Sequence, residues 1–216
     1  IGAGRATVTV RASSRLGDIV LVAVPDSEIA RVAAGLAASG VRWAGRTVLH
    51  TSGLQPARLL APLARRGALV ASLHPVQSFA RKDAPASVFA GITWGVEGDP
   101  AAVATCVRIV RALRGRVLLL SDKDKPLYHA ACSLASNALV ALEATAAGAL
   151  RAVGIEGREA EAMLLPLVQG TLQNVKDLGL EKALTGPIFR GDVDTVRGHL
   201  KALGGNPEAR EVYTVL

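Results

Sequence analysis

The pattern of apolar and polar positions changes its period once along the chain, near residue 122. Before that point, short apolar runs rich in Val, Ile and Leu alternate with amphipathic stretches, whereas almost everything from Asp124 onward has the period of helices. Strands that alternate with helices are typical of an α/β domain with a parallel sheet. The pattern therefore predicts an α/β domain over residues 1–122 and an all-α domain over residues 123–216.

The first domain contains several predicted strands. The run DIVLVAVP, from Asp18 to Pro25, is continuously apolar, which indicates a strand buried on both faces. Ser27 or Asp26 can cap the helix that follows, predicted from Glu28 to Ser39. The other predicted strands span 46–49, 68–72, 91–98 and 116–120, and the other predicted helices span 56–66 and 100–114.

The chain begins with a glycine-rich sequence, IGAGR, from Ile1 to Arg5. Such a turn lets backbone N–H groups approach a pyrophosphate, although a lone GxG is weak evidence. Ala6 to Val10 already has the pattern of another strand, and a crossover between parallel strands needs a dozen or more residues. We therefore expect that a segment is missing after Arg5.

Polar residues follow the predicted strands. Pro25-Asp26-Ser27 ends one strand, His50-Thr51-Ser52-Gly53 ends the next, and His74 follows a third. In open α/β sheets ligands bind beyond the carboxyl ends of the strands, so these residues are candidates for a binding site. The alternatives are ordinary connecting loops and histidines with a purely structural role.

The stretch from Lys125 to Asn137 carries a polar stripe on a long apolar helix predicted from Lys125 to about Ala152. At 3.6 residues per turn, His129, Ser133 and Ser136 share one narrow sector. Lys125 lies below that sector, and Cys132 and Asn137 lie at its edges. The stripe indicates either a ligand cleft or side chains that bond their own helix.

The predicted second domain contains further helices at 159–178 and 193–203, the latter capped by Asp192, and a short one from Pro207. Between them, the Pro- and Gly-rich turn 184–192 holds Thr185 and Arg190. Thr185 can donate a hydrogen bond to an anion, and Arg190 can bind a carboxylate or phosphate in bidentate fashion. The alternative is a simple connection in which Arg190 pairs with Asp192 or Asp194.

Composition narrows the function classes. The net charge of +7 comes from scattered arginines, with little aromatic interleaving, so we expect no nucleic-acid partner. Cys106 and Cys132 have no metal or redox spacing, which predicts reduced thiols and no metal site. No bounded membrane span and no signal sequence are evident, so we expect a cytoplasmic protein without a membrane partner.

Five separated motifs resemble a bacterial family that has a Rossmann-like domain followed by a helical domain of unknown function 2520: VAVPDSEI, HTSG, SLHPVQSF, YHAACSLASN and LTGPIFRGD. The layout is more distantly similar to pyrroline-5-carboxylate reductase, 3-hydroxyisobutyrate dehydrogenase and coenzyme-F420-dependent NADP reductase. The resemblance implies a doubly wound Rossmann-like domain, an all-α domain like the C-terminal domain of 6-phosphogluconate dehydrogenase, and a homodimer formed through the helical domain.

The resemblance also implies NADP or NAD as cofactor, bound by residues at the strand ends: Gly2, Gly4, Arg5, Pro25, Asp26, His50, Thr51 and Ser52. One departure stands out. The lysine that precedes the catalytic asparagine by one helical turn in hydroxyacid dehydrogenases is replaced here by Ser133, four residues before Asn137.

The leading hypothesis is an NAD(P)-dependent oxidoreductase that transfers a hydride to or from a small, anionic keto, hydroxy, imine or amine substrate. His129 is the first candidate for the proton donor because imidazole titrates near neutral pH, and His74 is the second. Asn137, Ser133 and Ser136 would orient the substrate, and Thr185 and Arg190 would bind its anionic group. The alternative hypothesis is a non-catalytic NADP(H)-binding sensor or assembly protein.

Overall fold

A computed structural model describes residues 10–11, 14, 16–81 and 83–216 of the chain. Contacts divide the chain into two compact units that meet between Ser133 and Leu134. The first unit thus extends past the boundary predicted at residue 122, because the helix that opens at Lys125 packs its first turns against the sheet. The predicted strand at Ala6 to Val10 and the glycine-rich turn lie outside the described residues, except for Val10.

The first unit is built on a mixed five-stranded sheet with the order β1-β2-β3-β4-β5. The first three strands pair in parallel, β4 runs antiparallel to β3, and β5 is parallel to β4. The strands span Ile19–Val22 (β1), Thr47–His50 (β2), Leu69–Pro75 (β3), Thr93–Gly98 (β4) and Arg116–Leu119 (β5). The predicted α/β fold is confirmed, and β3 is longer than predicted, so that His74 lies within the strand.

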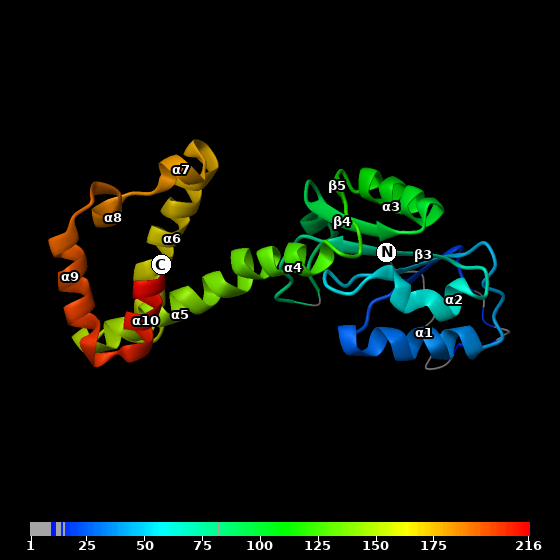
Figure 1. Ribbon diagram of the computed structural model, residues 1–216, viewed down its shortest axis with the longest axis horizontal. Coiled ribbons are helices and arrows are strands. Elements are labelled where there is room, and N and C mark those ends of the chain that lie inside the picture. The colour runs from blue at the N-terminus through cyan, green and yellow to red at the C-terminus, as the bar shows by residue number, and fades with distance from the viewer. Residues whose placement is uncertain (1–9, 12–13, 15, 82) are drawn as a thin grey trace. The chain divides into compact units, whose positions relative to one another are not determined.

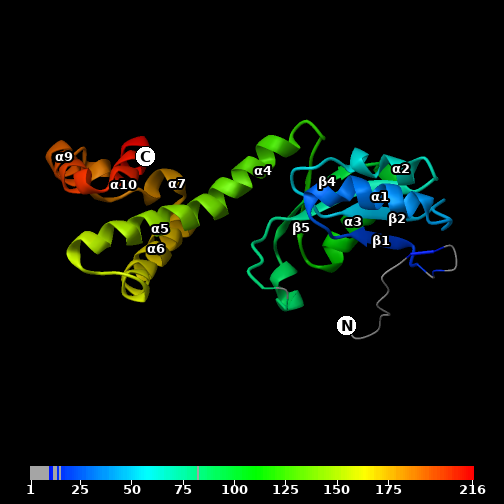
Figure 2. The same cartoon turned by 90° about the horizontal axis from the view of Figure 1, so that it is seen from below.

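Helices cover the two faces of the sheet. The helices α1 (Ile29–Ala38) and α2 (Ala61–Ala64) cover one face, and α3 (Pro100–Ala112) lies on the other (Figure 1). Seen from below, α1 passes in front of the sheet (Figure 2). Short 3-10 turns complete this unit at Asp26–Glu28, Ala57–Leu60 and Ala86–Phe89.

Alternation along the strands sorts the core into two layers. Val20, Val48 and Val70 are in register, and with Val22 they face α1 and α2. Leu21, Leu49 and Ala71 are in register on the opposite face, where α3 covers Leu49 and Ala71. Each strand therefore contributes to both layers, as expected for a sheet with helices on both faces.

The prediction that β1 is buried on both faces is wrong. Ile19 is 47% exposed and Leu21 is 54% exposed. Among the described residues, β1 is an edge strand, and α3 packs against β2 to β5. The half of this sheet face that carries β1 is therefore open.

The prediction that Asp26 or Ser27 caps α1 is also wrong. The residue before α1 is Glu28, which makes no side-chain capping bond. The carboxylate of Asp26 instead accepts a hydrogen bond from Ser52. The turn after β1 thereby binds the loop after β2 rather than its own helix.

A long helix begins in the first unit and continues into the second. It consists of α4 (Lys125–Ser133), a π-helical segment at Leu134–Ala138, α5 (Leu139–Leu150) and a 3-10 turn at Arg151–Val153. The wider π-helical turn changes the angular position of the residues that follow Ser133. The prediction that aligned His129 with Ser136 assumed a regular helix of 3.6 residues per turn, which this segment does not follow.

The same helix, Lys125–Val153, is long and apolar enough to cross a membrane by length and composition alone. Core helices of soluble proteins satisfy the same criteria. At its first turn Lys125 is fully buried in the first unit, where it bonds to Ser52 after β2 and to Ser72 within β3.

The second unit is helical, as predicted. After α5 come α6 (Arg158–Leu178), α7 (Leu180–Ala183), α8 (Gly186–Arg190), α9 (Val193–Ala202) and α10 (Pro207–Val215). The side chain of Asp192 accepts from the Thr195 N–H, so the predicted cap of α9 is confirmed. The stretch predicted as a turn at 184–192 instead contains α8, whose first turn accommodates Pro187.

Candidate functional site

The first two turns of α4 present one face to the sheet. Its residues stand at positions i, i+3, i+4, i+7 and i+8, which share one side of a helix. The residues between them are exposed. The face that is fully or partly buried consists of Lys125, Tyr128, His129, Cys132 and Ser133.

Lys125 joins this helix to the loop after β2 and to the middle of β3. Its side chain is completely buried, and its Nζ lies 3.1 Å from the Ser52 carbonyl oxygen and 2.6 Å from Ser72 Oγ. Burial lowers the pKa of Lys125, while the charges of Glu97 and Asp26 act in the opposite direction. The ammonium group therefore fixes the loop after β2, the strand β3 and the start of α4 to one another.

The loop after β2 is held from a second side by Ser52. Its hydroxyl donates to an Asp26 carboxylate oxygen at 2.6 Å and accepts from the Gln55 N–H at 2.8 Å. Both bonds are internal to the protein. Ser52 thus shapes the loop, and its contact with a cofactor stays a prediction.

His50 is fully buried at the end of β2. Its Nδ1 accepts from the Ser52 N–H at 3.2 Å, and its Nε2 has no partner at hydrogen-bonding geometry among the described residues. Burial lowers its pKa to about 4, and the nearby Pro56 carbonyl only partly offsets that effect. In this geometry His50 supports the loop, and its contact with a cofactor stays a prediction.

His74 and His129 meet at the same edge of the sheet. Their ring centroids lie 5.8 Å apart, with the rings inclined at 74°. Burial, followed by the proximity of His129 and of Lys125, lowers the pKa of His74 to about 4. His74 is therefore neutral at physiological pH.

Because Gly53 has no side chain, the rings of His74 and His129 have room to meet beside it. A Cβ atom at this position would lie 2.5 Å from Cδ2 of His129 and 2.8 Å from Nε2 of His74. A Cβ atom does not approach other heavy atoms so closely, so any side chain here would displace a histidine. The last residue of HTSG is thus glycine for a steric reason.

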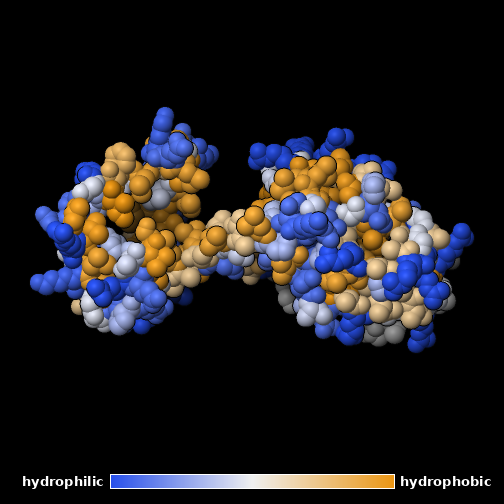
Figure 3. Space-filling view, in the orientation of Figure 1, coloured by the Kyte–Doolittle hydropathy of each residue, from blue (hydrophilic) through white to orange (hydrophobic). Residues whose placement is uncertain are grey.

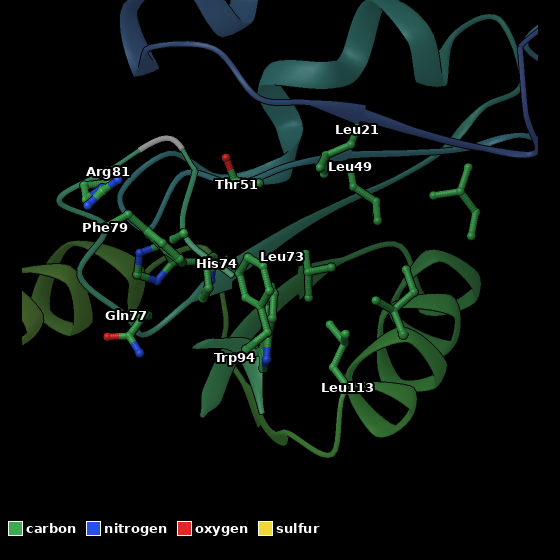
Figure 4. A pocket seen from close by; sticks show the side chains of 15 residues that line it. Leu21, Leu49, Thr51, Leu73, His74, Gln77, Phe79, Arg81, Trp94 and Leu113 are labelled. Atoms are coloured by element: carbon green, nitrogen blue, oxygen red, sulfur yellow. The ribbon is translucent and has the colours of Figure 1, made fainter. Parts of the chain in front are cut away.

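A cavity of about 710 Å³ opens beside His74, within the size range of small-molecule sites (Figure 4). Its polar end, at the carboxyl ends of β2 and β3, carries Thr51, His74, Gln77 and Arg81. The rest is apolar and follows the open half of the sheet face. It is lined by Ile19, Leu21, Leu49, Leu73, Phe79, Phe89, Trp94, Ile109 and Leu113, among others.

In the described part of the chain, no group of three His, Cys, Asp or Glu side chains is placed to hold a metal ion. The polar groups at the cavity are instead hydrogen-bond donors and acceptors. Such groups can orient a small polar molecule and exchange a proton with it.

Comparison with known families identifies the chain. The family model for a Rossmann-like domain matches residues 4–75, and the model described as "Domain of unknown function (DUF2520)" matches residues 92–216, more than half of the chain. The chain belongs to the DUF2520 family. The resemblance inferred from its five motifs is thereby confirmed. No curated protein matches this DUF2520 protein in sequence.

Several solved structures have the same fold. Protein TM1727 from Thermotoga maritima is 25% identical with a TM-score of 0.76, and the match covers 94% of this chain and 76% of that one. BF3122 from Bacteroides fragilis, a proposed NADP oxidoreductase, is 22% identical with a TM-score of 0.72, over 96% and 76% of the two chains. An imine reductase from Myxococcus stipitatus in complex with NADP+ is 17% identical with a TM-score of 0.58, over 92% and 73%.

The predicted site residues of the DUF2520 protein fall into three groups. Thr51 and His74 line the cavity, and His129 contacts the His74 ring. The turn of Pro25 and Asp26 is joined to the same loop by the bond from Ser52 to Asp26. Ser133 ends the first unit. The residues of the second unit are Ser136 and Asn137 in the π-helical segment, Thr185 before α8 and Arg190 at its end, all but Ser136 exposed. Gly2, Gly4 and Arg5 lie outside the described residues.

The sequence prediction missed Lys125 and Tyr128 as members of the site. Tyr128 Oη lies 2.7 Å from His74 Nδ1, so it contacts one of the two histidines directly. A signal for both was available, because Lys125, Tyr128 and His129 follow the i, i+3, i+4 spacing at the start of an otherwise apolar helix.

Gly53→Ala should separate the two histidine rings. The new Cβ has no room between His129 and His74, whereas Gly35→Ala in α1 meets nothing within 4 Å and serves as the matched control. We expect the imidazole signals of both histidines to shift in NMR spectra of Gly53→Ala and to stay unchanged in Gly35→Ala. Unchanged signals in Gly53→Ala would contradict the packing described here.

Stability should fall as the pH drops from about 6.5 to about 4. His50 has a pKa of about 4 when folded and 6.5 as its ordinary value, so in this window the unfolded chain binds the extra proton. Folding is therefore weakened by up to about 3 kcal/mol for a fully buried histidine. Urea titrations followed by tryptophan fluorescence will measure this in the first unit, which contains both Trp43 and Trp94. In His50→Gln the free energy of unfolding should depend less steeply on pH. An equally steep pH dependence would exclude His50 as its source.

Proposed function

We propose that this DUF2520 protein is a nicotinamide-dependent oxidoreductase that acts on a small anionic keto, hydroxy, imine or amine compound. The observation that supports it best is the meeting of His74 and His129 over Gly53, at the carboxyl ends of parallel strands and beside a cavity of about 710 Å³. Taken by itself, the similarity to the solved reductases supports the fold and does not support the reaction.

The proposed cofactor is NADP or NAD. Solved structures with this fold include the imine reductase in complex with NADP+ and a reductive aminase from Aspergillus terreus in complex with NADPH. In the described part of the chain, a nicotinamide cofactor would fit against three small features: the turn at Pro25, the Thr51 side chain and the backbone at Gly53. All three lie at the strand ends, where such ligands bind. When bound, the nicotinamide supplies or accepts the hydride. Gly2, Gly4 and Arg5 are proposed to hold its phosphates.

The protein's own groups would position the substrate and move one proton. His129 is the proposed proton donor, because it borders the gap at Gly53 and lies beside a neutral ring. His74 is the second candidate for this role. We further propose that Ser133, Ser136 and Asn137 orient the substrate, and that Thr185 and Arg190, from the same or a second subunit, bind its anionic group.

A binding protein without catalysis is the second candidate function. It is favoured by Ser133, which replaces the lysine of hydroxyacid dehydrogenases, and by the complete burial of Lys125, which keeps that amine away from a ligand. Such a protein would bind NADPH or a metabolite as a sensor. In either function we propose a cytoplasmic protein without nucleic-acid or membrane partners.

His129→Ala should abolish turnover while NADPH still binds. Loss of a proton donor slows catalysis by about 10²–10⁴-fold, whereas the contacts proposed for the cofactor are elsewhere. Binding is followed by NADPH fluorescence, and turnover by NADPH absorbance with a panel of keto acids and imines. His199→Ala in α9 is the control. An equal loss of NADPH affinity would contradict the proposed roles, and binding without oxidation of any compound would favour the sensor.

The second unit supports the proposed homodimer. Its fully buried apolar residues are the small Ala160, Ala183 and Ala209, whereas large apolar side chains remain exposed on most of its helices (Figure 3). An apolar groove of about 780 Å³ is lined by residues of α5, α6 and α10, including Leu142, Leu172 and Val215. Exposed apolar surface of this extent is typical of subunit interfaces.

Leu172→Glu should break the dimer. Leu172 is 52% exposed in the groove, and a buried unpaired carboxylate at an interface is costly. We expect wild type to sediment as a dimer and Leu172→Glu to sediment as a monomer. Leu118→Glu, at a site 42% exposed on the edge strand β5, should leave the dimer intact. A wild-type monomer at micromolar concentration would exclude this interface.

A further inference from the structure

Tyr128 contacts His74 through the ring nitrogen that faces away from Gly53. The Tyr128 Oη lies 2.7 Å from His74 Nδ1, and the two rings meet edge to face with centroids 5.6 Å apart at 89°. The phenol fits between α4 and the sheet because β4 carries glycine opposite His74. A Cβ at Gly95 would lie 2.6 Å from the phenol oxygen.

Both partners are uncharged at neutral pH. Burial raises the pKa of Tyr128 well above its usual value, with a further rise from Cys132, so the phenol keeps its proton. The pKa of His74 is about 4, so its ring is neutral and carries one N–H. The hydrogen bond between them can then run in either of two directions.

The acceptors around the phenol decide the direction. A phenolic O–H needs an acceptor, and a thiol such as that of Cys132 is a weak one. Among the described residues, the imidazole nitrogen Nδ1 of His74 is the acceptor at hydrogen-bonding distance. With Nδ1 accepting, the ring hydrogen is on Nε2.

The other nitrogen of His74 faces the place where the two histidines meet. Nε2 lies 2.8 Å from the position of a Cβ on Gly53, and it has no hydrogen-bond partner in the part of the chain that the structure describes. His74 also lines the cavity of about 710 Å³. An N–H at Nε2 is therefore available to a molecule in that cavity.

We propose that Tyr128 is a positioning residue that holds His74 in the tautomer with its hydrogen on Nε2, so that the ring offers a neutral hydrogen-bond donor to the carbonyl oxygen or imine nitrogen of the substrate. The inference rests on the proposed function for the substrate, whereas the tautomer follows from the contact of Tyr128 with His74 and from the neutral state of both rings. His74 and His129 then have different tasks, because the neutral donor polarises the acceptor atom and the second histidine exchanges the proton.

The chain contains a matched control for this pair. In the second unit, His199 Nδ1 lies 2.8 Å from Tyr213 Oη, with ring centroids 5.7 Å apart at 88°. That pair has nearly the same geometry as His74 and Tyr128, but it is exposed. Removing its hydroxyl tests whether loss of any tyrosine–histidine bond affects the site.

The test is long-range ¹H–¹⁵N NMR of histidines in the full-length protein at neutral pH. In wild type we expect His74 to show a protonated Nε2 and an unprotonated Nδ1. Tyr128→Phe should give averaged nitrogen shifts for His74, as expected for two exchanging tautomers, whereas Tyr213→Phe should leave His74 unchanged. A protonated Nδ1 in wild type, or the same His74 pattern in Tyr128→Phe, would overturn the proposal.

Kinetics provides the second arm once a substrate is found. Tyr128→Phe should lower kcat about tenfold with little change in KM. Without the hydroxyl, His74 is no longer held in the Nε2 tautomer, and its hydrogen bond to the substrate is one that strengthens in the transition state. A higher KM at constant kcat would contradict a role in positioning. Since the tautomer is read without turnover, failure of the proposed reaction and failure of this inference are distinguishable.

Discussion

The geometry of the site depends on one buried ammonium group. Lys125 Nζ binds the Ser52 carbonyl and the Ser72 hydroxyl, and so connects α4 to the loop after β2 and to the middle of β3. A buried charge is costly unless it is hydrogen-bonded, and a buried polar group that loses its partner costs about 1–3 kcal/mol. A buried lysine at this position therefore needs the hydrogen bonds of both serines, and the position of α4 depends on Lys125, Ser52 and Ser72 together.

The position of α4 in turn sets the chemistry of the histidines. His129 and Tyr128 follow Lys125 by one helical turn, so fixing the lysine brings both side chains to His74. Two glycines, Gly53 and Gly95, provide the space for them. Close packing also removes water from His74, which keeps that ring neutral beside a second titratable histidine. Packing and protonation are thus consequences of the same arrangement.

Much of the α/β unit could be predicted because its pattern is local. Valine and isoleucine runs identified the strands, and their carboxyl ends correctly indicated where polar residues gather. The two histidines at strand ends could not be told apart in this way, since His50 points into the core and His74 toward the cavity. That difference depends on which neighbours cover each side chain.

The contacts that organise the site are long-range. Lys125 lies 73 residues from Ser52 and 53 residues from Ser72 along the chain, so no local pattern could pair them. The π-helical segment at Leu134–Ala138 could not be predicted either, because the expected helix was counted at a regular 3.6 residues per turn. The exposed face of β1 was mispredicted because apolar composition alone does not show which strand lies at an edge.

The complete burial of Lys125 has a consequence for the surface chemistry of the protein. Its neighbour Lys123 is exposed two residues earlier in the same segment, so the two amines differ in solvent access while sharing almost the same sequence context. An acylating reagent would modify Lys123 in the folded protein and reach Lys125 after α4 has left the sheet. The pair therefore forms an internal reporter of local opening at this helix.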